Sequence, residues 1–134
     1  MQTRLRVNVR PLIVLAEDSP EFRALIAGAL ERVGYRVVQV GTGDRLVAVC
    51  QQLASDGDRP RLIVTDVRMP TLGGLDASRM LRDAGDTTPL IFMTAWGDTL
   101  TRTRAHELGA VLLDKPLSIG TLRHEVQKLV PLTS

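Results

Sequence analysis

The sequence has few aromatic residues, a single cysteine and no long apolar run. Aromatic side chains make up 3% of the 134 residues, so the core has to be built from aliphatic side chains. The lone Cys50 excludes an internal disulfide and suits a reducing cytosol, so we expect a cytoplasmic protein with Cys50 in the core. No run reaches transmembrane length, and the first residues lack the apolar segment of a signal peptide. We therefore expect no membrane contact.

Positive charge is not concentrated either. The net charge is only +2, and the arginines are scattered rather than gathered into a stripe with aromatic neighbours. This pattern argues against nucleic-acid contact by the domain. Three arginines near the start (Arg4, Arg6 and Arg10) predict a solvated basic arm over residues 1–10. The length and the ordinary composition then predict one globular domain over residues 11–130, followed by a short tail over 131–134.

Apolar runs of strand length alternate with amphipathic segments of helix length. Strands are predicted at about 11–17 and at 36–40, and from the apolar runs 62–65, 90–93 and 111–113. A first helix is predicted to begin after Ser19, as its cap, and to end at Gly34, with later helices near 75–84, 98–108 and 118–129. Such alternation is typical of an α/β protein with a parallel sheet. We expect a doubly wound five-stranded sheet in flavodoxin-like order 2-1-3-4-5, with helices on both faces and the more polar strand 36–40 near an edge.

Polar residues stand where four of the five predicted strands end. The acids Glu17 and Asp18 follow the first strand, and Asp66 ends the third, before Pro70 and a Gly-Gly pair. Thr94 follows the fourth strand, and an Asp-Lys-Pro sequence containing Lys115 follows the fifth. Ligands of open α/β sheets bind at the carboxyl ends of the strands, and the predicted order puts the first strand beside the third. The sequence therefore predicts a site for a divalent cation and a phosphoryl group.

The three acids favour a bound Mg²⁺. Two carboxylates 4 Å apart repel each other by about 4 kcal/mol at an effective dielectric of 20, and a cation with oxygen ligands relieves that repulsion. We expect Asp18 and Asp66 as direct ligands, Glu17 as a ligand through water, and the backbone carbonyl of Arg68 as a further ligand.

Asp66 is also placed to act as a nucleophile toward phosphorus, which gives an aspartyl phosphate. Phosphoryl transfer depends mostly on positioning and charge neutralisation. Lys115 is expected to pair with one phosphoryl oxygen, while the Thr94 hydroxyl and the Ala95 N–H bond another.

Taken together, these residues resemble the receiver domain of bacterial two-component response regulators, the CheY-like fold. The match rests on the following residues, in the order the family has them: Glu17-Asp18, Asp66 with Met69-Pro70 and Gly74, Thr94-Ala95 and Lys115-Pro116. The resemblance implies phosphoryl transfer from a sensor histidine kinase or phosphotransfer protein, self-dephosphorylation and no substrate turnover. It also implies a cis bond before Pro116, and a switch face, formed by the fourth helix, fifth strand and last helix, for a downstream protein or a homodimer.

The sequence departs from this family at the switch. The family usually has Tyr or Phe three residues before the lysine, where this chain has Leu112. Arg68 and Trp96 occupy two rim positions that influence phosphoryl lifetime in the family. We expect these two side chains to crowd the attacking water and lengthen that lifetime; an equal alternative makes Trp96 a partner-contact residue.

Other functions remain open. A Mg²⁺-dependent phosphohydrolase of the haloacid-dehalogenase type usually has a second Asp two residues after the nucleophile, where Arg68 stands here. A flavodoxin-like FMN protein needs a hydroxyl-rich phosphate loop after the first strand, which is missing. A degenerate receiver that acts only as an interaction module is the third alternative. His106 and His124 lack a second ligand at metal spacing, so we expect both to be solvated.

Overall fold

A computed structural model describes residues 10–132 of the chain. The predicted basic arm lies outside the described residues except for Arg10, whose backbone carbonyl accepts a hydrogen bond from Arg36 Nε. The end of the predicted tail, residues 133–134, also lies outside them. Across the described residues, no helix is both long and apolar enough to cross a membrane.

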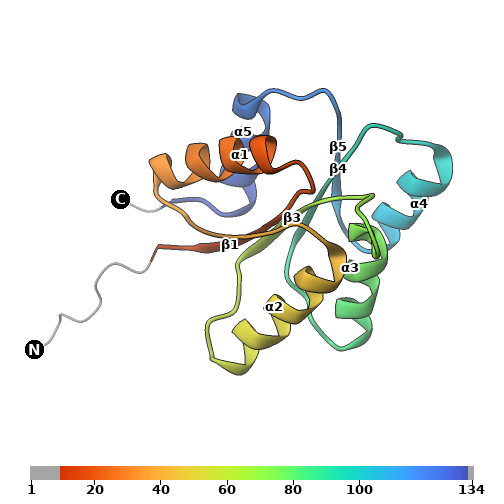
Figure 1. Ribbon diagram of the computed structural model, residues 1–134, viewed down its shortest axis with the longest axis horizontal. Helices are drawn as coiled ribbons and strands as arrows, with labels where there is room; N and C mark the ends of the chain where they lie inside the picture. The colour runs from red at the N-terminus through yellow and green to blue at the C-terminus, as the bar shows by residue number, and fades with distance from the viewer. Residues whose placement is uncertain (1–9, 133–134) are drawn as a thin grey trace, which may run out of the picture.

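Five parallel strands form one sheet in the order β2-β1-β3-β4-β5, as predicted (Figure 1). The strands are β1 (Leu12–Ala16), β2 (Arg36–Val40), β3 (Leu62–Asp66), β4 (Leu90–Thr94) and β5 (Val111–Asp114). β1, β3 and β4 are buried along their whole length, which explains their uninterrupted apolar sequence. The more polar β2 lies at one edge of the sheet, as predicted, and β5 lies at the other.

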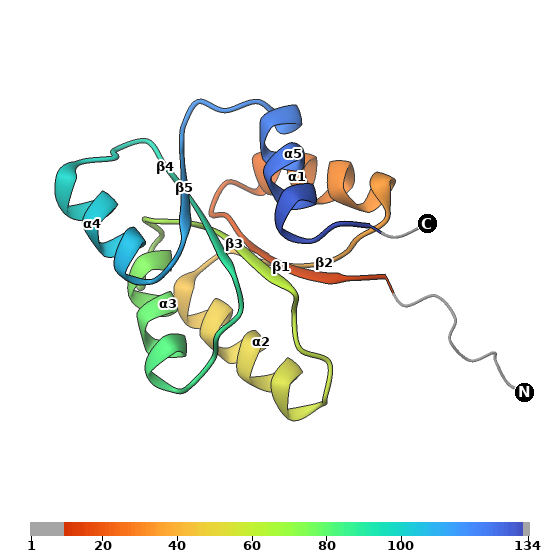
Figure 2. The same ribbon diagram turned by 180° about the vertical axis from the view of Figure 1, so that it is seen from behind.

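Five helices cover the two faces of the sheet. They are α1 (Pro20–Val33), α2 (Gly43–Ser55), α3 (Gly74–Asp83), α4 (Thr99–Glu107) and α5 (Ile119–Leu129). Helices α1 and α5 pack on one face, and α2, α3 and α4 on the other (Figures 1 and 2). Each face has its own core of mainly aliphatic side chains, with Phe92 on the α2–α3 side and Tyr35 on the α1–α5 side, and Cys50 is buried on the α2–α3 side. Burial raises the pKa of the Cys50 thiol to about 12, and this core placement confirms the prediction.

Most predicted boundaries differ from the structure by one residue, and two of the helix starts do so for the same reason. The predicted helices 98–108 and 118–129 began on Asp98 and Ser118. Both residues have an extended backbone and cap the helix from outside, accepting hydrogen bonds from Thr101 N and Thr121 N. The predicted first strand was two residues too long, and Ser19 caps α1 as predicted. His106 and His124 are exposed, as predicted.

Candidate functional site

Three carboxylates meet at the carboxyl ends of β1 and β3. Because these strands are neighbours, Glu17 and Asp18, just past β1, lie beside Asp66 at the end of β3. One carboxylate oxygen from each of the three lies within 4.8 Å of the others. Glu17 and Asp66 are buried, at 1% and 3% exposure, whereas Asp18 is exposed. Two of the acids are therefore fixed inside the protein, and the third faces the solvent.

The turn after β3 holds Asp66 tightly in place. A Cβ on Gly74 would lie 1.9 Å from the Asp66 carbonyl oxygen, and one on Gly73 would lie 2.5 Å from the Val67 carbonyl oxygen. No side chain fits at either position, so the Gly-Gly pair lets α3 begin directly against the end of β3. The backbone N–H of Asp18 donates to Asp66 Oδ2 over 3.4 Å. The β1 and β3 ends are thereby held together.

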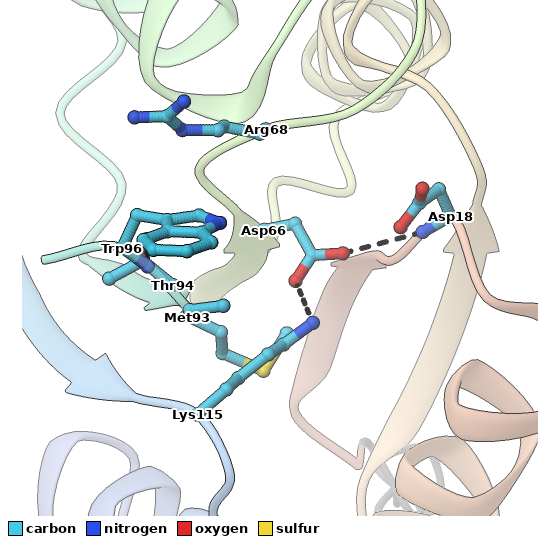
Figure 3. A pocket seen from close by; sticks show the side chains of 8 residues that line it. Asp18, Asp66, Arg68, Met93, Thr94, Trp96 and Lys115 are labelled. Atoms are coloured by element: carbon cyan, nitrogen blue, oxygen red, sulfur yellow. Dashed lines mark hydrogen bonds and ion pairs between the residues drawn. The ribbon is translucent and has the colours of Figure 1, made fainter.

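Lys115 reaches into this acidic cluster from the end of β5. Its Nζ lies 2.6 Å from Asp66 Oδ1 (Figure 3) and 3.1 Å from Glu17 Oε1. The Lys115–Pro116 peptide bond is cis, as the resemblance implied, and the Lys115 N–H donates to the Thr94 carbonyl. The ammonium also lies 5.4 Å from the centre of the Phe22 ring. One cation thus faces two buried carboxylates.

Burial and the neighbouring Glu17 raise the pKa of Asp66 to about 8, although Lys115 acts in the opposite direction. Burial alone lowers the pKa of Lys115, but its contacts with Asp66 and Glu17 outweigh burial, so this pKa lies above its usual value. Lys115 is therefore charged. A single lysine does not compensate all the negative charge of the cluster, so the carboxylates favour an additional cation.

The opposite side of the site is formed by the β4–α4 loop. The Thr94 hydroxyl accepts a hydrogen bond from Trp96 N over 3.0 Å. Trp96 is 69% exposed, and Figure 3 shows it with Arg68 on the side of the site away from Asp18. A cavity of about 200 Å³ opens between these groups, lined by Asp18, Asp66, Arg68, Met93, Thr94, Ala95, Trp96 and Lys115.

The structure thus gathers seven of the nine predicted site residues around one cavity. Glu17 does not line the cavity but lies buried beside Asp66, and Leu112 packs against the core on the α2–α3 side instead. The sequence analysis assigned no site role to Phe22 or Arg23. Arg23 donates to the Glu17 carbonyl over 2.7 Å and so fixes the turn that carries the acidic pair. Phe22 also packs against the core on the α1–α5 side, and nothing in the sequence marked Arg23.

The cluster fits a hard divalent cation. All three nearby side chains offer carboxylate oxygens, which are the ligands that Mg²⁺ prefers. Within the described residues, Asp66 Oδ1 is a buried oxygen that accepts no aligned hydrogen bond, although the Lys115 ammonium lies close to it as an ion pair. A carboxylate oxygen carries two lone pairs, so Asp66 Oδ1 can bind a metal beside its ion pair with Lys115.

The chain matches the family model described as the response regulator receiver domain over residues 13–127. It is 33% identical over 125 residues to the response regulator MprA of Mycobacterium ulcerans, covering 92% of this chain and 51% of MprA. It is 26% identical over 123 residues to sporulation initiation phosphotransferase F of Bacillus subtilis, covering 91% of this chain and 95% of that protein. The chain thus spans about half the length of MprA, and likewise 50% of the regulator ycf27 of Cyanophora paradoxa.

Among solved structures, a receiver domain of a histidine kinase from Syntrophus aciditrophicus superimposes with a TM-score of 0.75. The two are 31% identical, and the match covers 92% of this chain and 95% of that one. The fold, the rim of acids and the family match agree: this chain belongs to the response regulator receiver domain family.

Proposed function

We propose that this chain is a phosphoacceptor switch in which Asp66 receives a phosphoryl group from a sensor histidine kinase or a phosphotransfer protein. Receiver domains of two-component systems are signalling switches that bind Mg²⁺ at an acidic pocket and interact with such kinases or phosphotransfer proteins. One observation carries the assignment to Asp66: its buried carboxylate lies 2.6 Å from a lysine at the edge of an open cavity.

The transfer step needs little from the protein beyond position and charge. A carboxylate oxygen of Asp66 attacks the phosphorus of a phosphohistidine, an O–P bond forms and the N–P bond breaks. The electron pair of the broken bond stays on the imidazole nitrogen of the donor. Lys115 then pairs with a phosphoryl oxygen, and the Thr94 hydroxyl and Ala95 N–H donate to another. All four residues already line the same cavity.

Asp18 and Asp66 would hold Mg²⁺ directly, Glu17 through a water molecule, and Arg68 through its backbone carbonyl. When bound, the ion would neutralise negative charge on the transferring phosphoryl group. Asp18 suits the direct role because it is the exposed acid of the cluster. Glu17 is engaged with Lys115 and with the N–H of Ser19, which suits an indirect role.

The phosphorylated domain is proposed to change its binding to a downstream protein, or to a second copy of itself, through the face formed by α4, β5 and α5. Turnover is limited to self-phosphorylation from small donors and self-dephosphorylation. The functional unit is proposed to span residues 11–130. Sedimentation with and without a phosphoryl mimic tests the pairing, and an unchanged mass counts against it.

The decisive experiment is an intact mass measurement after incubation with acetyl phosphate and Mg²⁺. We expect a phosphoryl adduct on the wild type that is absent without Mg²⁺ and absent from Asp66→Asn. Asp76→Asn, which changes an exposed acid in the first turn of α3, is the matched control and should keep the adduct.

Other outcomes select the other functions. A folded wild type that takes up no phosphoryl group is a degenerate receiver. Rapid, continuous phosphate release that leaves no lasting adduct and is abolished in Asp66→Asn indicates an aspartyl-nucleophile phosphohydrolase.

A further inference from the structure

Arg102 connects α4 with the β4–α4 loop and with the end of β5, beside the site. From α4, its Nε donates to the Gly97 carbonyl over 2.9 Å. Its Nη2 contacts both carboxylate oxygens of Asp114, at 2.8 and 3.0 Å. Gly97 lies in the β4–α4 loop and Asp114 ends β5. We call Arg102, Gly97 and Asp114 the Arg102 latch.

The latch is connected to the phosphoryl-binding residues at both of its ends. Gly97 lies two residues after Ala95 in the same loop, and Asp114 immediately precedes Lys115. The Lys115 N–H donates in turn to the Thr94 carbonyl. Only a short stretch of backbone therefore separates Thr94 and Ala95 from the Gly97 carbonyl.

The ion pair that holds the loop on the β5 side is shorter than the one on the site side. On the site side, the nearest ion pair joins Arg68 Nη2 to Asp98 Oδ2 at 4.0 Å, with both side chains mostly exposed. The latch has three shorter contacts. The core holds α4 weakly, because Thr101 and Ala105 are its only buried residues. The latch thus supplies three of the polar contacts that hold the loop and α4 in place.

We propose that Arg102 is a positioning residue that holds the β4–α4 loop in its unphosphorylated position and so opposes phosphoryl binding. This inference rests on the proposed function. A phosphoryl group that draws Thr94 and Ala95 toward it pulls the Gly97 carbonyl away from Arg102. A contact that forms in only one of two loop positions shifts the equilibrium toward that position. Removing the latch therefore raises the affinity for a phosphoryl group.

Gly97 provides an independent way to open the latch. A Cβ at this position would lie 2.6 Å from Arg102 Nη2 and 2.7 Å from Asp114 Oδ1. Both atoms are ends of exposed side chains that can move aside, so Gly97→Ala should fold and should separate the pair. Arg102→Lys keeps the charge but loses the planar fork, and should lie between the wild type and Arg102→Ala.

The chain also contains a matched control for Arg102. At the start of β2, Arg36 donates through Nε to a backbone carbonyl and through its other nitrogens to both oxygens of Asp58. Its exposure resembles that of Arg102, at 41% against 50%. Since parallel strands begin at the edge opposite to their carboxyl ends, Arg36 lies at the far edge of the sheet from the site. Arg36→Ala removes the same kind of contact without touching the loop.

The test is a titration with beryllium fluoride, a phosphoryl mimic, in the presence of Mg²⁺, followed by the fluorescence of Trp96, the single tryptophan. We expect the dissociation constant to fall about threefold in Arg102→Ala and in Gly97→Ala, as expected for the loss of an exposed ion pair. It should not change in Arg36→Ala. Urea unfolding of the variants separates this effect from a general loss of stability.

The two proposals fail in different ways. A wild type that does not respond to the mimic contradicts the proposed function, and the latch proposal fails with it because it rests on that function. A wild type that responds, together with an unchanged or weaker affinity in Arg102→Ala and Gly97→Ala, overturns the latch alone. An equal gain in Arg36→Ala also overturns it.

Discussion

The carboxyl ends of β1 and β3 differ from those of β4 and β5 in how firmly they are held. Glu17 and Asp66 are buried, and the glycines after Asp66 pack directly against the backbone that precedes them. The other half presents an exposed Trp96 and a mostly exposed Asp114. β1, β3 and β4 have a strand on each side, whereas β5 is an edge strand. Asp66 and Glu17 are thus fixed inside the protein, and the part proposed to respond is close to the surface.

The helices that follow these strands show the same contrast. α1, after β1, buries four residues and is covered by α5 on its face of the sheet. α4, after β4, buries Thr101 and Ala105, of which only one is apolar. Elements with few buried apolar contacts open at lower free energy than the core. The difference suggests that chemistry and signalling are divided between the two halves, and it can be tested by mutation.

The largest effect is expected from shortening matched leucines in the two halves. Leu15 in β1 is fully buried, while Leu113 in β5 is half-buried, and both pack in the core on the α1–α5 side. Leu15→Ala should lower the free energy of unfolding by about 3 kcal/mol. Leu113→Ala should lower it by only about 1 kcal/mol, because less apolar area is lost. Urea unfolding measures both, and equal losses would contradict the contrast between the halves.

A smaller effect is expected from removing the cation that joins the halves. Lys115→Ala leaves two buried carboxylates facing each other, and we expect a loss of about 2 kcal/mol in unfolding free energy without Mg²⁺. Saturating Mg²⁺ should recover much of that loss, because an ion that binds only the folded state stabilises it. The control is Lys128→Ala, which removes an exposed lysine paired with Glu125 at 3.4 Å. A loss that Mg²⁺ does not reduce would argue against metal binding by the acids.

The buried half was the more predictable one from sequence. Apolar runs that end on acids determine both where β1 and β3 lie and which of their residues meet, because parallel strands end at a common edge. Glu17, Asp18 and Asp66 could be found this way without any contact being known. The sequence also showed that a Gly-Gly pair follows Asp66, although the close backbone contact of Gly74 became clear only in the structure.

The exposed half was less predictable, for a physical reason. Arg102 and Asp114 are ordinary charged residues in the sequence, and their pairing depends on how α4 crosses the end of β5. No periodicity encodes that crossing, since the apolar pattern of α4 is weak. The same holds for Arg23, which reaches the Glu17 carbonyl across a turn. Long polar side chains find partners that local patterns do not specify.

The smallest expected effect concerns the rim of the cavity, where the two halves meet. Arg68 and Trp96 both line the cavity that holds Asp66, and both also line an adjoining cavity of about 430 Å³. Water that attacks an aspartyl phosphate has to approach through this rim. Replacing both residues with Ala should therefore speed phosphate loss by roughly threefold, which corresponds to about 0.7 kcal/mol. The rate is measured from the decay of the phosphoryl adduct after the donor is removed.

Arg79→Ala with Leu100→Ala is the control, because both side chains are exposed and neither lines the cavity that holds Asp66. The control should leave the rate unchanged. If the Arg68 and Trp96 double variant also keeps the wild-type rate, the rim does not shield the phosphoryl group. The 69% exposure of Trp96 would then favour its alternative role, as an aromatic anchor for a protein partner. In that case the boundary between the two halves would serve recognition rather than phosphoryl lifetime.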